Sequence, residues 1–193
     1  MTDMAHDSSG FAGANGGRLL TSRPYAGDTD LPAIVALIDA CEEVDKLDRG
    51  TSVEEMRAAL AAPGVDPARD LSLWEDDDGR LLGLGRLILT PDNVDVEGRF
   101  WFHIHPTARG EMLEGRIIAW GEGRACEAGR AWSQAARLLT FARADKDARI
   151  TTLGAHGFER VRYFYTMARP LTSPLPTPRA PSGFVVRPLQ RVS

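Results

Sequence analysis

One junction restricts the fold of this chain more than any other feature: an apolar strand that runs directly into a long amphipathic helix. Alternating residues from about Asp95 to His105 predict the strand, and Pro106 ends it. Apolar residues at helical spacing predict a helix from about residue 110 to residue 128. The short connection places unpaired backbone N–H groups and the positive end of the helix dipole beside a strand end, which favours an anionic ligand.

The segments around this junction predict a domain that mixes helices and strands. The turn at residues 76–79 joins two of the strands into a hairpin. Ser52 and Glu55 form a capping box, which predicts a helix start. The predicted strands cover residues 19–22, 71–74, 80–89, 135–142 (buried), 159–162 and 164–168, and the predicted helices cover residues 31–41, 52 to about 62, and 147–156.

The length and the composition along the chain predict one domain with extensions. A chain of 193 residues suits a single domain. Residues 1–17 carry no apolar period and predict a disordered tail, so the domain is expected at 18–170. Residues 171–182 are rich in proline and predict an extended linker.

The last segment, residues 183–193, is predicted as an extra strand because it repeats the opening pattern of a short strand before Arg-Pro. It is where a second copy of the domain would begin. We expect this strand to pair with a sheet edge of this chain or of a partner molecule, so a homodimer is one expected assembly.

Charge and cysteine content exclude several classes of protein. A net charge of −4 without a basic block argues against nonspecific nucleic-acid binding. No apolar run approaches the roughly 20 residues of a membrane span. Cys41 and Cys126 lack the spacing of metal ligands, so no metal is expected, and a cytoplasmic location is the expectation.

The order of these segments resembles the GNAT acyltransferase superfamily over about residues 18–169. The residues that match the superfamily pattern are Pro106, Arg109 and Gly110 after the strand, Gly157-Phe158 after the short helix, and Arg23-Pro24 in the first strand. The closing Met167-Ala168-Arg169-Pro170-Leu171 is similar to the two-domain members of the superfamily. The resemblance implies an α/β GNAT-like fold, with a mixed, largely antiparallel sheet and helices on both faces.

The resemblance also implies an activity: transfer of an acetyl group from acetyl-CoA to an amine, carried by a small molecule or by a peptide N-terminus or side chain. The pyrophosphate would lie at the start of the long helix, and the pantetheine arm would pair with the strand before it. The implied cofactor-binding residues are Phe102, Ile104, Arg109, Gly110, Glu111, Met112, Leu113 and Glu114.

The sequence departs from the superfamily pattern in this loop. Met112 and Glu114 stand where the motif has small residues, and Glu111 adds a second carboxylate. A carboxylate at ~4 Å repels a phosphate by about 1 kcal/mol in a water-like dielectric. Acidic residues in a first helical turn also stabilise the helix dipole, which leaves a second hypothesis open: a non-catalytic structural or ligand-sensing domain.

The candidate catalytic residues are His103, His105 and Tyr163. Imidazole titrates near neutral pH, so either histidine is a candidate general base. Alternation places both histidines on one face of the strand, with Phe102 and Ile104 on the other. Leu153 occupies the position where superfamily members often place a tyrosine that protonates the thiolate, so Tyr163 is the candidate substitute. Packing within the sheet is the alternative role for all three.

Overall fold

The computed structural model describes residues 20–46, 50–91, 94–110, 112–172, 179–185 and 187. The chain divides into two units, residues 1–159 and residues 160–193, and each is described by itself. The helices and strands of the described residues all lie in the first unit. The predicted tail of residues 1–17 lies outside the described residues.

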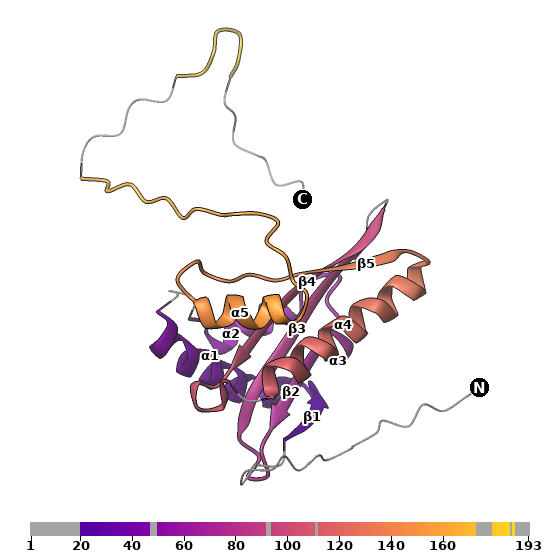
Figure 1. Ribbon diagram of the computed structural model, residues 1–193. Coiled ribbons are helices and arrows are strands. Elements are labelled where there is room, and N and C mark those ends of the chain that lie inside the picture. Colours follow the sequence, from indigo (N-terminus) through magenta and orange to yellow (C-terminus); the bar gives the residue numbers. More distant parts are fainter. Residues whose placement is uncertain are drawn as a thin grey trace. The chain divides into compact units, whose positions relative to one another are not determined.

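A five-stranded sheet forms the centre of the first unit (Figure 1). Neighbouring strands follow the order of the chain, and the first four pair in antiparallel fashion. The fifth runs parallel to the fourth. The strands are β1 (Thr21–Pro24), β2 (Leu71–Glu75), β3 (Leu81–Pro91), β4 (Asp95–Ile104) and β5 (Ala135–Leu139). The predicted mixed, largely antiparallel sheet is therefore confirmed.

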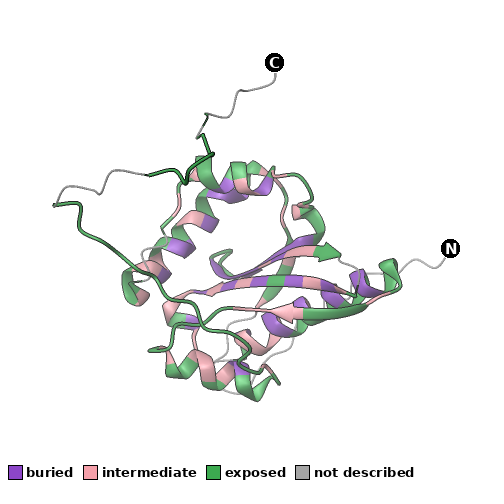
Figure 2. Cartoon of the chain, turned by 90° about the horizontal axis from the view of Figure 1, so that it is seen from above, coloured by how far each residue is buried: buried purple, intermediate pink, exposed green. Residues whose placement is uncertain are grey.

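Helices cover both faces of the sheet, as predicted. One cluster of buried side chains joins α1 and α2 to β2 and β3. A second cluster joins α4 and Leu153 of α5 to β3 and β4. Figure 2 shows buried stretches both on the strands and on the helices. The helices are α1 (Leu31–Asp45), α2 (Val53–Leu60), α3 (Pro67–Asp70), α4 (Leu113–Trp132) and α5 (Asp147–Ala155), with short 3-10 turns η1 (Asp28–Asp30) and η2 (Pro106–Ala108).

Local sequence signals explain several of these elements. The capping box of α2 is present: Ser52 Oγ accepts the backbone N–H of Glu55, and Glu55 accepts the backbone N–H of Ser52. Leu31, Ile34 and Ile38 form one buried side of α1, as their spacing predicts. The two helices consequently place an apolar surface on the sheet.

Two predicted features near the end of α4 differ from the structure. β5 is exposed over Ala135–Arg137 instead of buried, because it forms the outer edge of the sheet and only β4 accompanies it. The helix continues past Gly129 to Trp132, and Ser133 closes it with a positive φ of 54°. Gly129 lies within the helix, and close packing requires a glycine there, since a Cβ would lie 2.8 Å from the backbone oxygen of Gln134.

The two strands predicted at residues 159–162 and 164–168 are absent from the structure, and this prediction is wrong. The described chain has no regular secondary structure between Phe158 and Pro170. Large apolar side chains of this stretch are exposed, including Tyr163 and Met167. A strand needs a neighbour that satisfies its backbone groups, and no partner strand accompanies this stretch among the described residues.

The segment predicted as an extra strand at residues 183–193 is described only in part. Residues 182 and 183 form a turn, closed by a hydrogen bond from Phe184 N to Pro181 O. Residues 184, 185 and 187 have no regular structure, and residues 186 and 188–193 lie outside the described part of the chain. The linker predicted at 171–182 contains a turn at 171–172 and no helix among its described residues.

The close contact of β3 with α4 depends on glycine. A Cβ at Gly85 would lie 2.9 Å and 3.0 Å from two ring carbons of Trp120. Trp120 is held in turn by the ring of Trp74, with centroids 5.7 Å apart. We expect Gly85→Ala to lower the free energy of unfolding by about 1–3 kcal/mol, because overpacking displaces the indole.

The matched control is Gly123→Ala on α4, where a Cβ would meet nothing within 4 Å. This change should be neutral or slightly stabilising, since alanine favours the helix. Urea denaturation of the two variants measures the difference. Equal stabilities would show that the contact between β3 and α4 adapts without cost.

Candidate functional site

The candidate site begins where β5 stops pairing with β4. The parallel pairing covers Asp95–Arg99 of β4 and Ala135–Leu139 of β5. Beyond Arg99, β4 continues to Ile104, and no other strand of the described residues pairs with it on this side. The strand therefore presents an open edge of backbone groups over its last five residues.

The register with β3 shows which backbone groups face this open edge. The backbone N–H of His105 donates to Leu82 O at 2.8 Å, and His103 pairs with Leu84. Residues of an antiparallel pair alternate between those bonded to the partner strand and those directed away from it. Phe102 and Ile104 are the latter, so their N–H and C=O groups point to the open edge. The cofactor-binding role predicted for these two residues stays a prediction.

Side chains of this chain already contact both carbonyls. Arg149 Nη1 of α5 lies 3.5 Å from Phe102 O. Arg109 Nε donates to Ile104 O at 3.1 Å, and Cys41 Sγ lies 3.2 Å from the same oxygen. A ligand that used these carbonyls would have to displace the guanidinium groups.

A cavity of about 350 Å³ lies at the start of α4. It is lined by residues of the β4–α4 loop, the first turn of α4 and one side of α5, namely Gly110, Met112, Glu114, Gly115, Thr152 and His156. Gly110 has a positive φ of 78°, which glycine adopts without strain. The unpaired N–H groups of the first helical turn face this end of the helix, so the cavity has the polarity that an anion requires.

The carboxylate of Glu114 competes with an anionic ligand for the backbone N–H groups of this cavity. Its Oε1 accepts the backbone N–H of Gly110 at 3.0 Å. Its Oε2 is buried and has no hydrogen-bond partner among the described residues. The carboxylate thus takes one of the donors that a phosphate would use, and its charge repels an incoming anion.

Arg109 does not point into the cavity. Its two terminal nitrogens donate to both carboxylate oxygens of Asp45 on α1, at 2.9 Å and 2.7 Å. Burial alone would raise the pKa of Asp45, but Arg109 and Lys146 together hold it below its ordinary value. Burial likewise opposes the charge of Arg109, yet the pairing with Asp45 raises its pKa. Arg109 therefore anchors the loop to α1.

The other predicted cofactor-binding residues divide into three kinds. Met112 is 70% exposed at the mouth of the cavity. The Leu113 side chain is fully buried in the cluster beneath α4, so only its backbone can serve a ligand. Glu111 lies outside the described residues.

The two histidines are held differently. His103 is half-buried and pairs opposite Leu84, whose side chain belongs to the cluster with α1 and α2. His105 follows the end of β4, with Nε2 2.7 Å from Arg80 and Nδ1 2.8 Å from Thr107 Oγ1. Burial, Arg80 and Arg109 lower the pKa of His105. An arginine donor implies that Nε2 is unprotonated and accepts, so the imidazole is neutral.

The tyrosine candidate belongs to the other unit of the chain. Tyr163 belongs to the second unit, where it is 68% exposed. Leu153, at the position where superfamily members often have a tyrosine, is buried in the cluster with α4. The catalytic role of Tyr163 stays a prediction.

Sequence reasoning missed one side of α5. Arg149, Thr152 and His156 recur at intervals of three and four residues and therefore share a face of the helix. Thr152 and His156 line the cavity, and the His156 ring lies where a Cβ at Gly115 would be only 3.2 Å away. The helical spacing of these polar residues was the signal available in the sequence.

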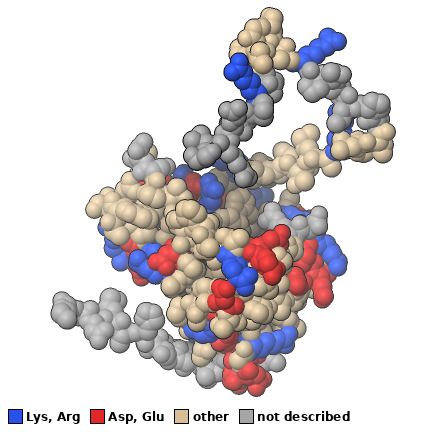
Figure 3. All heavy atoms as spheres, turned by 180° about the vertical axis from the view of Figure 1, so that it is seen from behind, with Lys and Arg blue, Asp and Glu red and all other residues tan. Residues whose placement is uncertain are grey.

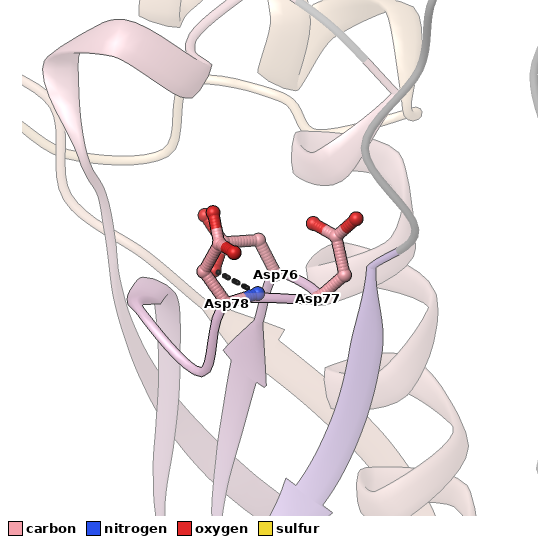
Figure 4. Close-up of side chains that lie close together, drawn as sticks. All are labelled: Asp76, Asp77 and Asp78. Carbon is pink, nitrogen blue, oxygen red and sulfur yellow. Dashed lines mark hydrogen bonds between the residues drawn. The ribbon is translucent and has the colours of Figure 1, made fainter.

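Three aspartates gather at the turn between β2 and β3 (Figure 4). Carboxylate oxygens of Asp76, Asp77 and Asp78 lie within 4.8 Å of one another. Asp76 Oδ1 accepts the backbone N–H groups of Asp78 at 3.2 Å and Arg80 at 2.8 Å. These bonds close the hairpin turn, and we assign no metal to the cluster.

The surface charge is mixed. On the face in Figure 3, acidic and basic side chains lie next to one another. Across the described ranges of the chain, no helix combines the length and the apolar character of a membrane span.

A relative of known activity extends over most of this sequence. The chain is 31% identical over 159 residues to the mycothiol acetyltransferase of Thermobispora bispora. The match covers 82% of this chain and 48% of the relative, so the chain spans about half the length of the curated relative it matches. No protein-family model matches the chain.

Solved structures show the same fold. A GCN5-related N-acetyltransferase from Sphaerobacter thermophilus has a TM-score of 0.62 and 24% identity, over 74% of this chain and 44% of that chain. An AAC(6')-Iy structure in complex with a bisubstrate analogue, CoA-S-monomethyl-acetylneamine, has a TM-score of 0.55 and 14% identity, over 78% of this chain and 98% of that chain. At these identities the likeness concerns the fold.

Proposed function

Because the chain belongs to the GNAT acetyltransferase superfamily, with distant homology to mycothiol acetyltransferase over part of its length, we propose that it binds acetyl-CoA and transfers the acetyl group to an amine. The superfamily uses acetyl-CoA, and a CoA-based analogue is bound in one structure of the same fold. The observation that carries the proposal is the open edge of β4, which leads to the cavity at the start of α4.

The proposed arrangement assigns a part of the thioester to each region. The pyrophosphate lies in the cavity at the first turn of α4, where backbone N–H groups and the helix dipole favour an anion. The pantetheine arm lies along the open edge and pairs with the backbone groups of Phe102 and Ile104. Glu114, Arg109 and Arg149 are the side chains whose present hydrogen bonds must break when the ligand enters.

The proposed reaction is direct attack of the amine on the thioester carbonyl. The nitrogen bonds to the carbonyl carbon, the C–S bond breaks, and the sulfur keeps its electron pair. A base accepts the proton from the amine, and backbone N–H groups polarise the carbonyl oxygen. His103 and His105 are the candidate bases.

Substitution of a histidine tests the base. His103→Gln or His105→Gln should lower turnover at neutral pH by about 10²-fold or more if that imidazole is the base. Because the pKa of His105 is lowered, the imidazole stays neutral at pH values below the ordinary pKa of histidine. If His105 is the base, activity should therefore fall only at a more acidic pH than for an ordinary histidine. Rates and pH profiles that match those of the unchanged protein would exclude both residues.

A second function is favoured by specific contacts. Glu114 occupies Gly110 N–H, Arg109 is committed to Asp45, and Arg149 contacts the carbonyl of Phe102. These bonds suit a non-catalytic domain with a structural or ligand-sensing role. It would keep the fold without the reaction.

One experiment distinguishes the two functions. Calorimetric titration of the full chain with acetyl-CoA and with CoA measures binding, and release of free thiol with a panel of amines measures turnover. Binding with turnover supports the acetyltransferase. Binding without turnover on any amine supports the sensing domain, and the absence of binding rejects the use of acetyl-CoA.

A further inference from the structure

Arg149 is a cation for which the described part of the chain supplies no anion within ion-pair distance. No carboxylate among the described residues forms an ion pair with it, and its bonded contacts are neutral. Its guanidinium carbon lies 3.9 Å from the ring centroid of Phe102, and Nη1 lies 3.5 Å from Phe102 O. Arg149 is half-buried. A charge that is partly withdrawn from water is ordinarily paired, and the contacts described for Arg149 include no opposite charge.

The surroundings penalise this charge. Burial lowers the pKa of Arg149 to about 10, and nearby Arg109 lowers it further. Asp45 and Glu114 act in the opposite direction through space, but neither offsets the burial. A bound anion would stabilise the charged form of Arg149 and so offset the effect of burial.

The neighbouring carboxylates are already engaged. Asp45 accepts from both Arg109 and Lys146, the latter at 3.2 Å. Glu114 accepts from Gly110. The described part of this region therefore contains three cations, Arg109, Lys146 and Arg149, and two carboxylates. Neither carboxylate bonds to Arg149.

The position of Arg149 indicates which anion would meet it. It lies at the open edge of β4, beside the backbone of Phe102, which is two residues farther along β4 from the cavity than Ile104. An arm that leaves the cavity and follows this edge carries the reacting end of the thioester toward Arg149. The cavity for the phosphates is formed by Thr152 and His156, one and two turns farther along α5, and by the start of α4. The anion beside Arg149 is thus part of the acyl group rather than the pyrophosphate.

We propose that Arg149 binds the terminal carboxylate of a dicarboxylic acyl group, so that the thioester donor carries an acidic chain of the succinyl type. This inference rests on the proposed transferase function and narrows its donor. The bond changes stay those of acyl transfer: the amine nitrogen bonds to the acyl carbon, the C–S bond breaks and sulfur keeps its electron pair. The amine proton passes to the base. Arg149 fixes the far carboxylate and exchanges no proton.

The test compares two thioesters on the full chain. Isothermal titration with succinyl-CoA and acetyl-CoA should give tighter binding of succinyl-CoA by about 10-fold or more, because a paired carboxylate adds charge-assisted hydrogen bonds. Arg149→Gln should reduce that ratio to about 1, whereas Arg149→Lys should retain part of it through its charge. Arg130→Gln on the exposed side of α4 is the matched control and should leave the ratio unchanged.

Three outcomes would overturn the inference. Equal affinity of the unchanged protein for both thioesters would reject it while the transferase proposal stands. Tighter acetyl-CoA binding by Arg149→Gln without loss of the succinyl preference would identify Arg149 as an obstruction. Binding of neither thioester would reject both proposals. Thermal melting of each variant verifies folding, and Arg149→Lys decides the matter if Arg149→Gln does not fold.

Discussion

Replacing Arg124 with leucine is expected to destabilise the protein by about 3–5 kcal/mol, because it strands a buried carboxylate. Arg124 Nε of α4 lies 2.8 Å from Asp70 Oδ1 of α3, and the two side chains are only 11% and 8% exposed. Neither atom makes an aligned hydrogen bond, so the contact is an ion pair. Burial raises the pKa of Asp70, although Arg124 opposes the rise.

A double-mutant cycle measures this pair. Arg124→Leu and Asp70→Leu should each lower the midpoint of chemical denaturation strongly, whereas the combined variant should recover most of the loss, since no unpaired charge remains. Arg130→Leu, on the exposed side of the same helix, is the matched control and should change stability by less than about 0.5 kcal/mol. Additive losses in the double variant would show that the two charges are not coupled.

Opening the first turn of α4 is expected to tighten CoA binding by about 10-fold or more. In the double variant Met112→Gly, Glu114→Gly, one negative charge leaves the cavity and the backbone N–H of Gly110 becomes available. Removal of the repulsion contributes about 1 kcal/mol at ~4 Å, and a hydrogen bond to a charged group contributes about 1.5–3 kcal/mol. Met112 is 70% exposed, so its truncation leaves no cavity in the core.

Titration calorimetry with CoA checks this prediction. Glu114→Gln separates charge from space, because it removes the charge and keeps the volume, and its affinity should lie between those of the parent and the double variant. Glu122→Gln, exposed on the same helix, controls for the net charge of the protein. Affinity that is unchanged or weaker in the folded double variant would exclude the cavity as the pyrophosphate site.

Elements whose signals lie within a few neighbouring residues could be predicted from the sequence. Turn residues at 76–79 predicted the hairpin of β2 and β3, and Ser52 with Glu55 predicted the start of α2. Pro106 and Gly110 predicted the junction before α4, although the helix begins at Leu113. These features depend on residues within a few positions of one another, so the pattern contains the information that the structure uses.

The contacts within the candidate site join residues that are far apart in the sequence, so they could not be predicted from it. Arg109 has the position of a phosphate-loop residue, yet its charge is used by Asp45, 64 residues earlier in the chain. Arg149 reaches Phe102, 47 residues away, because α5 lies beside the open edge of β4. Spacing along the chain does not encode such pairings, since they depend on which helices the sheet brings together.

The same reason explains the wrong strands at 159–162 and 164–168. Apolar residues such as Tyr165 and Met167 fit a strand locally, but a strand forms only where a neighbour satisfies its backbone groups. β5 was likewise predicted as buried, and its place at the edge of the sheet leaves it exposed. The sequence of a segment indicates its preference for a strand. Whether the strand forms depends on the tertiary structure, because its backbone hydrogen bonds require a second segment beside it.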